Sequence, residues 1–236
     1  MARPVKIIES GGHPVVHVTG LDRATPGTPV DDPIPGWPIT LVPDGQGYPM
    51  VLVNDDGTEW SDVENLLTFT EQFDNAAWAN IRSSETGGQS DPFGGSDAFH
   101  LTEDSASGTH YIQQAIVHSD ASVYTLSLYV KDDGSGRNVR IFLNAASNPW
   151  ATFDSTDGSF VEDSASPDSH GSEQVGVTDW WRVWITSTNS AITQVRFYVV
   201  QAPATYSYAG DGSSGVLIYG AQLNEGGIKP YVSGAA

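Results

Sequence analysis

The chain has 236 residues, with 29 acidic side chains against 10 basic ones, and its formal net charge at pH 7 is −19. A surface of that charge repels phosphate backbones and anionic bilayers, so we expect no binding to nucleic acid or membrane. The sequence contains no cysteine, which excludes disulfides, thiolate catalysis and cysteine-ligated zinc.

The N-terminal residues MARPVKIIES contain no apolar run of signal-peptide length. No stretch of the chain approaches the roughly 18 consecutive apolar residues of a membrane-spanning helix. We therefore expect a soluble protein that is not exported by a cleaved signal. If the protein acts outside a cell, it would then have to be released by another route, such as assembly into a particle followed by lysis of the cell.

Residues 1–62 hold a loose repeat of short strands. The stretches GHPVVHV (12–18), GWPITLV (36–42) and GYPMVLV (47–53) each place a glycine and a ring-bearing residue before a proline, and each ends in valine. Proline is tolerated at the first residue of a strand, but strands this short cannot bury a core alone. We predict that residues 1–62 form an anchoring or oligomerising arm; a flexible extension is the alternative.

Aromatic side chains beside proline suit contacts with a partner. The starts of the three repeats supply the candidates for partner contact, which are His13, Pro14, Trp37, Pro38, Tyr48 and Pro49.

From residue 63 to residue 236, short runs rich in Val, Ile, Thr and aromatic residues are separated by Asp-Gly turns. Polar and apolar residues alternate in VYTLSLYV (123–130), NVRIFLN (138–144) and QVRFYVV (194–200). This pattern indicates an all-β sandwich or barrel. We predict an all-β fold in which the arm is followed by a two-sheet jelly-roll β-sandwich. The best candidate for a helical turn or two is TEQFDNAAWAN (70–80).

Alternation in four of these strands predicts which side chains face the core, because successive side chains point to opposite faces of a sheet. The residues expected to point inward are Leu126, Leu128, Val130, Val139, Ile141, Leu143, Val183, Ile185, Val195, Phe197 and Val199. The residues expected on the exposed face are Tyr129, Arg140, Phe142, Arg182, Trp184, Arg196 and Tyr198.

The exposed set combines aromatic rings with guanidinium groups. Aromatic planes can stack on sugar rings, and guanidinium groups can donate to hydroxyls or carboxylates. We hypothesise that these seven side chains form a patch for an acidic glycan. Three alternatives stay open. The residues could pack on one another or on a sister subunit, they could form a simple solvated face, or their strands could belong to different sheets, which would scatter the patch.

Four sequence stretches resemble, in their order, a recurrent module. They are NLLTFTEQFDNAAWAN (65–80), DWWRVWITST (179–188), YAGDGSSGVLIYGAQLNEG (208–226) and KPYV (229–232). Together they resemble the jelly-roll, carbohydrate-binding-module-like domain of bacteriophage virion proteins, which occurs in head fibres, head spikes and tail fibres. The resemblance covers roughly residues 65–232. Two details depart from the module's pattern, since Tyr219 stands where tryptophan is usual and Asn224 precedes Glu225.

The resemblance implies a non-enzymatic structural protein on the surface of a phage particle. It implies an arm that attaches to the major capsid protein or to another virion protein, a homotrimeric assembly, and adhesion to host-surface glycans as a further role. Head decoration or a head fibre is our first expectation, because the sequence has neither heptads nor a long shaft. The alternatives are a tail-fibre or receptor-binding lectin module, and an accessory module of a secreted enzyme. Trp78, Trp180 and Trp181 match core-packing positions of the module.

The stretch VLIYGAQLNEG (216–226) resembles the last strand of such a jelly roll. We expect Val216 and Ile218 to face the core, and Gln222 and Glu225 to bond the N-terminal strand near Glu71, so that the two ends are tied together. A structural calcium ion held by Glu71 and Glu225 is the alternative, since related modules often carry one, although no fixed ligand spacing is visible. No other cofactor is expected.

The sequence lacks the motifs of common catalytic sites. It has no Gly-x-Ser-x-Gly elbow, no phosphate-binding Gly-Lys-Ser/Thr loop and no dinucleotide fingerprint after a strand. In HSD (118–120) and DSH (168–170) the side chains diverge on an extended chain, so neither forms a triad. The Asp-Gly pair of residues 157–158 predicts a hairpin turn between Phe153 and Phe160. We expect no enzymatic activity.

Overall fold

A computed structural model describes residues 5–10, 13–18, 39–43, 49–52 and 64–235. The chain divides into two units, Met1–Val63 and Glu64–Ala236. All the regular elements of the described residues are β-strands, which confirms the all-β prediction. None of these residues belongs to a helix long and apolar enough to cross a membrane.

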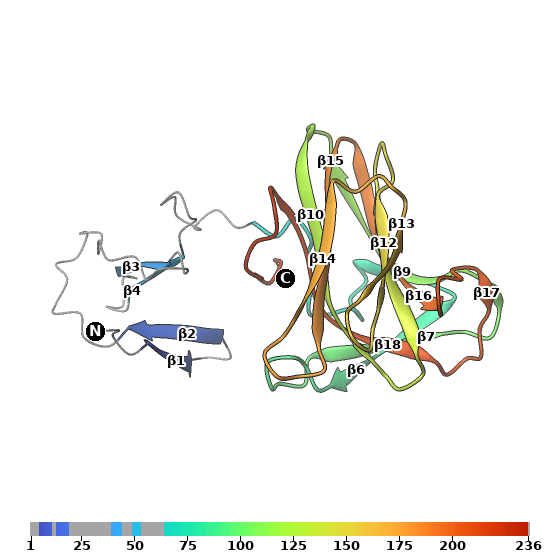
Figure 1. Ribbon diagram of the computed structural model, residues 1–236, viewed down its shortest axis with the longest axis horizontal. Helices are drawn as coiled ribbons and strands as arrows, with labels where there is room; N and C mark the ends of the chain where they lie inside the picture. Colours follow the sequence, from blue (N-terminus) through green and yellow to red (C-terminus); the bar gives the residue numbers. More distant parts are fainter. Residues whose placement is uncertain (1–4, 11–12, 19–38, 44–48, 53–63, 236) are drawn as a thin grey trace. The chain divides into compact units, whose positions relative to one another are not determined.

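The described residues of the first unit form two hairpins of two antiparallel strands each (Figure 1). β1 (Val5–Ser10) pairs with β2 (His13–Val18), and β3 (Ile39–Pro43) pairs with β4 (Pro49–Leu52). β2, β3 and β4 coincide with the strands of the three predicted repeats. A lone two-stranded hairpin is at best marginally stable in water.

The candidates for partner contact are only partly described. His13 and Pro14 open β2, and Pro49 opens β4 opposite Pro43. Trp37, Pro38 and Tyr48 lie outside the described residues.

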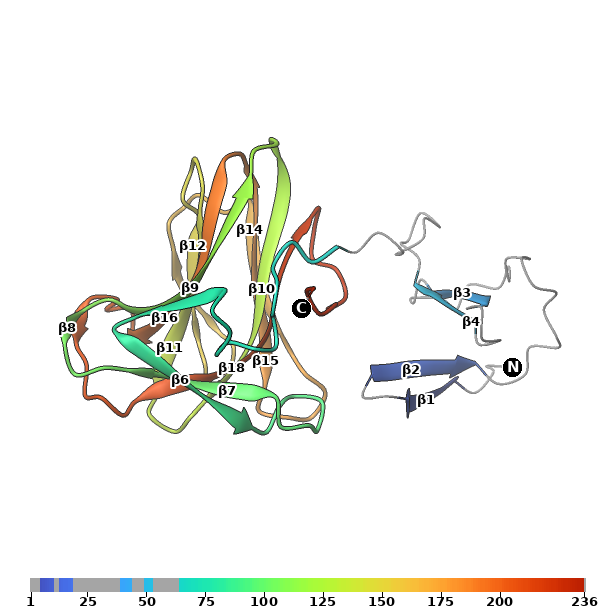
Figure 2. The same cartoon turned by 180° about the vertical axis from the view of Figure 1, so that it is seen from behind.

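The second unit is a jelly-roll sandwich of two six-stranded antiparallel sheets (Figure 1). Sheet A consists, in spatial order, of β14 (Ser169–Gln174), β15 (Trp181–Asn189), β10 (Ser122–Asp132), β18 (Gly215–Glu225), β7 (Ala98–Glu103) and β6 (Ser83–Gln89). Sheet B consists of β13 (Phe160–Asp163), β12 (Trp150–Asp154), β11 (Arg137–Asn144), β16 (Ile192–Gln201), β9 (His110–His118) and β5 (Trp78–Ile81). The short strands β8 (Ser107–Gly108) and β17 (Tyr208–Ala209) pair at one end of the sandwich, which Figure 2 shows from behind.

The core lies between the two sheets. All eleven residues predicted to point inward from β10, β11, β15 and β16 are at most 1% exposed and belong to one apolar cluster, so the alternation is confirmed. Aromatic rings close one side of this core, where Trp78 lies 4.9 Å from Phe73 and 5.9 Å from Phe197 between ring centroids. Trp180 is buried and Trp181 is partly buried, as expected.

Two local predictions have different outcomes. Phe153 and Phe160 face each other across β12 and β13, so the hairpin between them is confirmed. The predicted helical turns of residues 70–80 are wrong, because residues 69–78 form successive β-turns with hydrogen bonds between residues three apart, and β5 begins at Trp78. The side chain of Asn75 also accepts a hydrogen bond from the backbone N–H of Ala77, which competes with helix formation.

The stretch that resembles a closing strand is β18, which lies between β10 and β7 in the interior of sheet A. Val216 and Ile218 are completely buried there, as predicted. The two ends of the unit are tied by Asn65, whose amide donates to the carbonyls of Ala221 and Val232, at 2.9 Å each. The prediction that Gln222 bonds the N-terminal strand is wrong, because its amide bonds to the backbone of Pro230 and Val232 in the C-terminal segment. At the start of the unit, the side-chain amide of Asn65 makes the tie instead.

Candidate functional site

The seven candidates for glycan binding fall on two different sheets. Tyr129, Arg182 and Trp184 lie on β10 and β15 of sheet A, whereas the other four lie on β11 and β16 of sheet B. The hypothesis of a single patch is therefore wrong. The consecutive strands β10 and β11 belong to opposite sheets, as do β15 and β16, and alternation within a strand does not reveal which sheet the strand joins.

The four candidates on sheet B do lie together. Arg140 is directly opposite Tyr198 in the register of β11 and β16, and Phe142 is opposite Arg196. Residues directly opposite each other share a face and lie within contact distance. The outer face of sheet B therefore carries the aromatic and basic patch that the sequence predicted in part.

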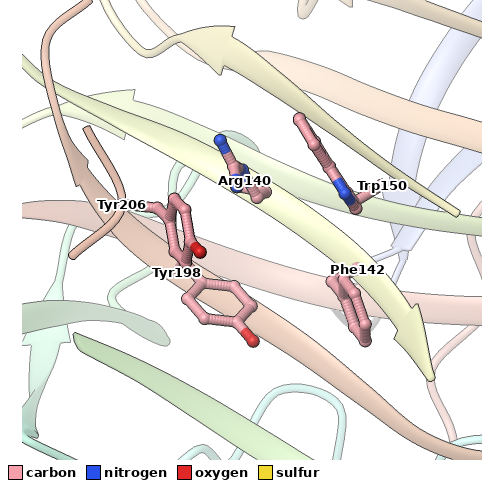
Figure 3. A pocket seen from close by; sticks show the side chains of 5 residues that line it. All are labelled: Arg140, Phe142, Trp150, Tyr198 and Tyr206. Carbon is pink, nitrogen blue, oxygen red and sulfur yellow. The ribbon is translucent and has the colours of Figure 1, made fainter. Parts of the chain in front are cut away.

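A pocket of about 200 Å³ lies in this patch (Figure 3). It is lined by Arg140, Phe142, Trp150, Tyr198 and Tyr206. Arg140 and Phe142 are two residues apart on β11, and Trp150 of β12 pairs with Phe142. Tyr206 comes from the loop after β16, where Gln201 and Thr205 exchange backbone hydrogen bonds and turn the chain back towards the pocket.

Arg140 is the central side chain of the pocket and is only 5% exposed. Its guanidinium lies between two rings, 3.8 Å from the centroid of Trp150 and 4.8 Å from that of Tyr206. Its Nε donates to Thr152 Oγ1 at 2.9 Å, and its Nη2 donates to Glu162 Oε1 at 2.5 Å. Burial lowers the pKa of Arg140, although the Glu162 carboxylate acts in the opposite direction. The arginine thus holds the two aromatic walls and the acid in fixed positions.

A second guanidinium continues the patch beside the pocket. Arg196 lies 5.3 Å from the ring centroids of both Tyr111 and Phe142, and its Nη1 donates to the hydroxyl of Tyr198 at 3.2 Å. Burial raises the pKa of Tyr198, against the effect of Arg196. The Tyr198 hydroxyl therefore stays protonated at neutral pH and can both donate and accept a hydrogen bond.

Sequence reasoning missed Trp150, Glu162 and Tyr206. The position of Trp150 could have been predicted from alternation. Ala151 and Phe153 of the same short strand are buried, so Trp150 lies on the outer face. Glu162 is paired with Thr152 across β12 and β13, so its place depends on a strand register that only the fold defines. Tyr206 lies in a loop, where no periodicity applies.

The three candidates on sheet A belong to other surroundings. Tyr129 is 6% exposed and packs with Tyr219, Tyr231 and Phe93, with ring centroids 5.4 to 6.0 Å away. Arg182 is 4% exposed, and its Nη2 donates to Ser127 Oγ at 3.1 Å. For Tyr129 and Arg182, the structure therefore agrees with the alternative in which the candidates pack against other side chains.

Trp184, the third of these candidates, is half-buried on β15 and lies over Gly171 of the neighbouring strand. A Cβ atom at position 171 would come within 2.4 Å of its ring. The absence of a side chain at position 171 thus leaves the space that the indole occupies.

The two candidate calcium ligands are engaged differently. Glu71 accepts hydrogen bonds from the hydroxyls of Tyr219 at 2.9 Å and Tyr231 at 3.0 Å, and burial raises the pKa of both hydroxyls. Glu225 lies at the exposed end of β18, opposite Tyr124. Within residues 64–235, no three His, Asp or Glu side chains are grouped so that they could hold a metal ion. Glu71 thus contributes to the closure as a hydrogen-bond acceptor.

Comparisons with known proteins add little to this description. No family model matches the sequence. No curated protein matches it either. Among solved structures, the chain is similar to the CBM22-1 and GH10 modules of the endo-1,4-β-D-xylanase 10B from Clostridium thermocellum, complexed with xylohexaose. The TM-score is 0.39 and the identity is 11%, over 72% of this chain and 30% of that one.

Proposed function

We propose that the second unit is a glycan-binding module without catalytic activity, and that its binding site is the pocket on the outer face of sheet B. The observation that carries this proposal is the arrangement of four aromatic side chains around the buried, hydrogen-bonded Arg140 in an open pocket of about 200 Å³. Ligand pockets for drug-sized molecules are larger, about 300 Å³ or more. This pocket suits one sugar ring.

The chemistry of the lining matches that of a pyranose. Aromatic rings offer apolar faces on which the C–H face of a sugar can stack. Around them, the hydroxyls of Tyr198 and Tyr206 and the carboxylate of Glu162 supply donors and acceptors for sugar hydroxyls. Because Arg140 and Tyr198 are already held by neighbouring side chains, the site needs little ordering when a sugar binds.

The substitution Tyr206→Ala should weaken glycan binding by roughly tenfold or more, because it removes one wall of the pocket. Tyr206 is 50% exposed in a loop, so we expect little change in melting temperature. Glycans selected on an array would be measured by titration calorimetry with the full chain.

Phe93→Ala is the matched control, since Phe93 is a 41% exposed aromatic residue that packs on sheet A. It should leave the affinity unchanged. Equal affinities of Tyr206→Ala and the wild type would rule out this pocket as the site.

We further propose that the module is displayed on a phage particle as a homotrimer, with residues 1–62 as the arm that attaches it to the major capsid protein or another virion protein. The order of the sequence stretches in residues 65–232 supports this proposal. So does the presence of two-stranded hairpins in the first unit, which need a partner or sister copies for stability. Attachment to a tail instead of a head is the alternative.

Deletion of residues 1–62 should give a folded domain that no longer binds particles, because the sandwich has its own core. Circular dichroism would establish folding, and co-sedimentation with particles would establish attachment. Sedimentation velocity should show a trimer for the full chain. Normal decoration by the truncated domain would contradict the role of the arm, and a monomeric full chain at micromolar concentration would contradict trimerisation.

A further inference from the structure

We infer that the pocket selects neutral sugars and rejects sugars that carry a carboxylate, and that the Arg140–Glu162 pair recognises sugar hydroxyls through hydrogen bonds. This inference rests on the proposed glycan binding at the same site. It reverses the sequence-based expectation of an acidic glycan, which treated the arginines of the patch as unengaged cations.

The first reason is that Arg140 already has its counter-ion. Its Nη2 is 2.5 Å from Glu162 Oε1, its Nε is bonded to Thr152, and the two aromatic rings cover its planar faces. A sugar carboxylate could form a two-pronged bond with this guanidinium only if it displaced Glu162. The exchange would gain no new ion pair, so it offers no preference for an acidic ligand.

The second reason is that Arg196 is engaged as well. Its Nε and Nη2 both donate to Gln194 Oε1, at 3.2 Å and 2.6 Å, and its Nη1 donates to Tyr198. Both guanidinium groups that were predicted on this face are therefore held within the sheet, Arg140 by an acid and Arg196 by a neutral amide and a hydroxyl. They act as supports for rings and hydroxyls.

The third reason is the position of the acid. The Glu162 side chain is 40% exposed and bonded to Arg140, which lines the pocket, so a carboxylate lies one side chain away from a ligand there. A carboxylate accepts hydrogen bonds only, whereas a sugar hydroxyl both donates and accepts. A neutral sugar can donate to Glu162 and accept from Arg140 at once. An acidic sugar places two like charges together, and the net charge of −19 adds to the repulsion.

The test compares pairs of glycans that differ only in one carboxylate, such as glucosides against glucuronides and galactosides against galacturonides. Binding to the wild-type full chain would be measured at low and high salt. We expect neutral members to bind at least about tenfold more tightly, with an affinity that changes little with salt. Tighter binding of the acidic members, weakened by salt, would overturn the inference.

The substitution Glu162→Gln should reduce the preference for neutral sugars by roughly tenfold, because it frees Arg140 for a ligand carboxylate. Glu173→Gln is the matched control, since it makes the same change on an exposed residue of β14 in sheet A. It should leave the preference unchanged. An unaltered preference in Glu162→Gln would refute the role of the pair.

The outcomes separate this inference from the proposed function. Acidic binding that is lost in Tyr206→Ala would refute the selectivity and keep the glycan site. If no glycan of either kind binds, or if binding does not respond to Tyr206→Ala, the proposed site itself is refuted.

Discussion

Replacing Glu103 by glutamine should lower the free energy of unfolding by about 3 kcal/mol at neutral pH, the range found when one partner of a buried ion pair is removed. Glu103 is 1% exposed at the end of β7. Its carboxylate accepts from Arg137 Nε at 2.8 Å and Nη2 at 2.7 Å, from the Tyr208 hydroxyl at 2.5 Å and from the backbone N–H of Asp211 at 2.9 Å. Glutamine would present an NH₂ group to some of these donors and leave Arg137 without its main counter-ion.

The same carboxylate makes stability depend on pH. Burial acts to raise the pKa of Glu103, but the hydrogen bonds from Arg137, Tyr208 and Asp211 outweigh it, and the pKa lies below its ordinary value of 4.5. A carboxyl whose pKa is lower in the folded state stabilises the fold above its unfolded pKa. This stabilisation is lost as the pH falls through the folded-state value. The wild type should therefore lose more stability than Glu103→Gln when the pH is lowered from about 7 to about 3.

Urea denaturation at both pH values would measure these differences. Asp179→Asn is the control, because it removes only the exposed pair with Lys131, whose atoms are 3.3 Å apart. Exposed pairs contribute about 1 kcal/mol or less. A Glu103→Gln variant as stable as this control, with an unchanged pH profile, would show that the network around Glu103 contributes little.

The sequence predicted the elements that depend on local pattern. Inward and outward positions within β10, β11, β15 and β16 follow from a period of two, and all eleven inward residues are buried. The hairpin at residues 157–158 follows from turn chemistry, since its Asp-Gly pair suits a tight turn. In both cases the information lies within a short stretch of chain, so no tertiary knowledge is needed.

The parts of the site that could not be predicted depend on contacts between distant segments. Alternation placed Tyr129 and Arg140 correctly on outer faces, yet those faces belong to different sheets. Glu162 reaches Arg140 through the pairing of β13 with β12 and of β12 with β11. Four of the seven predicted residues therefore share one face, on sheet B. The sequence did not predict that Arg140 is neutralised there, because its acid, Glu162, lies 22 residues away in the sequence.

The substitution Gly220→Ala should lower the free energy of unfolding by about 2 kcal/mol, through backbone strain together with crowding of two rings. Gly220 has a φ of +58°, where a side chain is disfavoured. A Cβ atom there would lie 3.0 Å from Tyr129 Cδ2 and 3.1 Å from Tyr231 Cζ. The glycine allows a bulge in β18, since Ser127 pairs with Gln222 whereas Tyr129, two residues on, pairs with Tyr219.

That bulge explains why Gly220 and Gln222 interrupt the alternation of side chains in β18. One extra residue in β18 keeps Tyr219 and Gln222 on the same face of sheet A, where Tyr219 donates to Glu71 and Gln222 accepts from the backbone N–H of Val232. Gly176→Ala isolates the strain, because Gly176 has a φ of +57° and a Cβ atom added there would have no neighbouring atom within 4 Å. It should cost about 1 kcal/mol. If urea denaturation gives the two alanine variants equal stabilities, the aromatic packing around Gly220 tolerates a methyl group and the close approach is not required for closure.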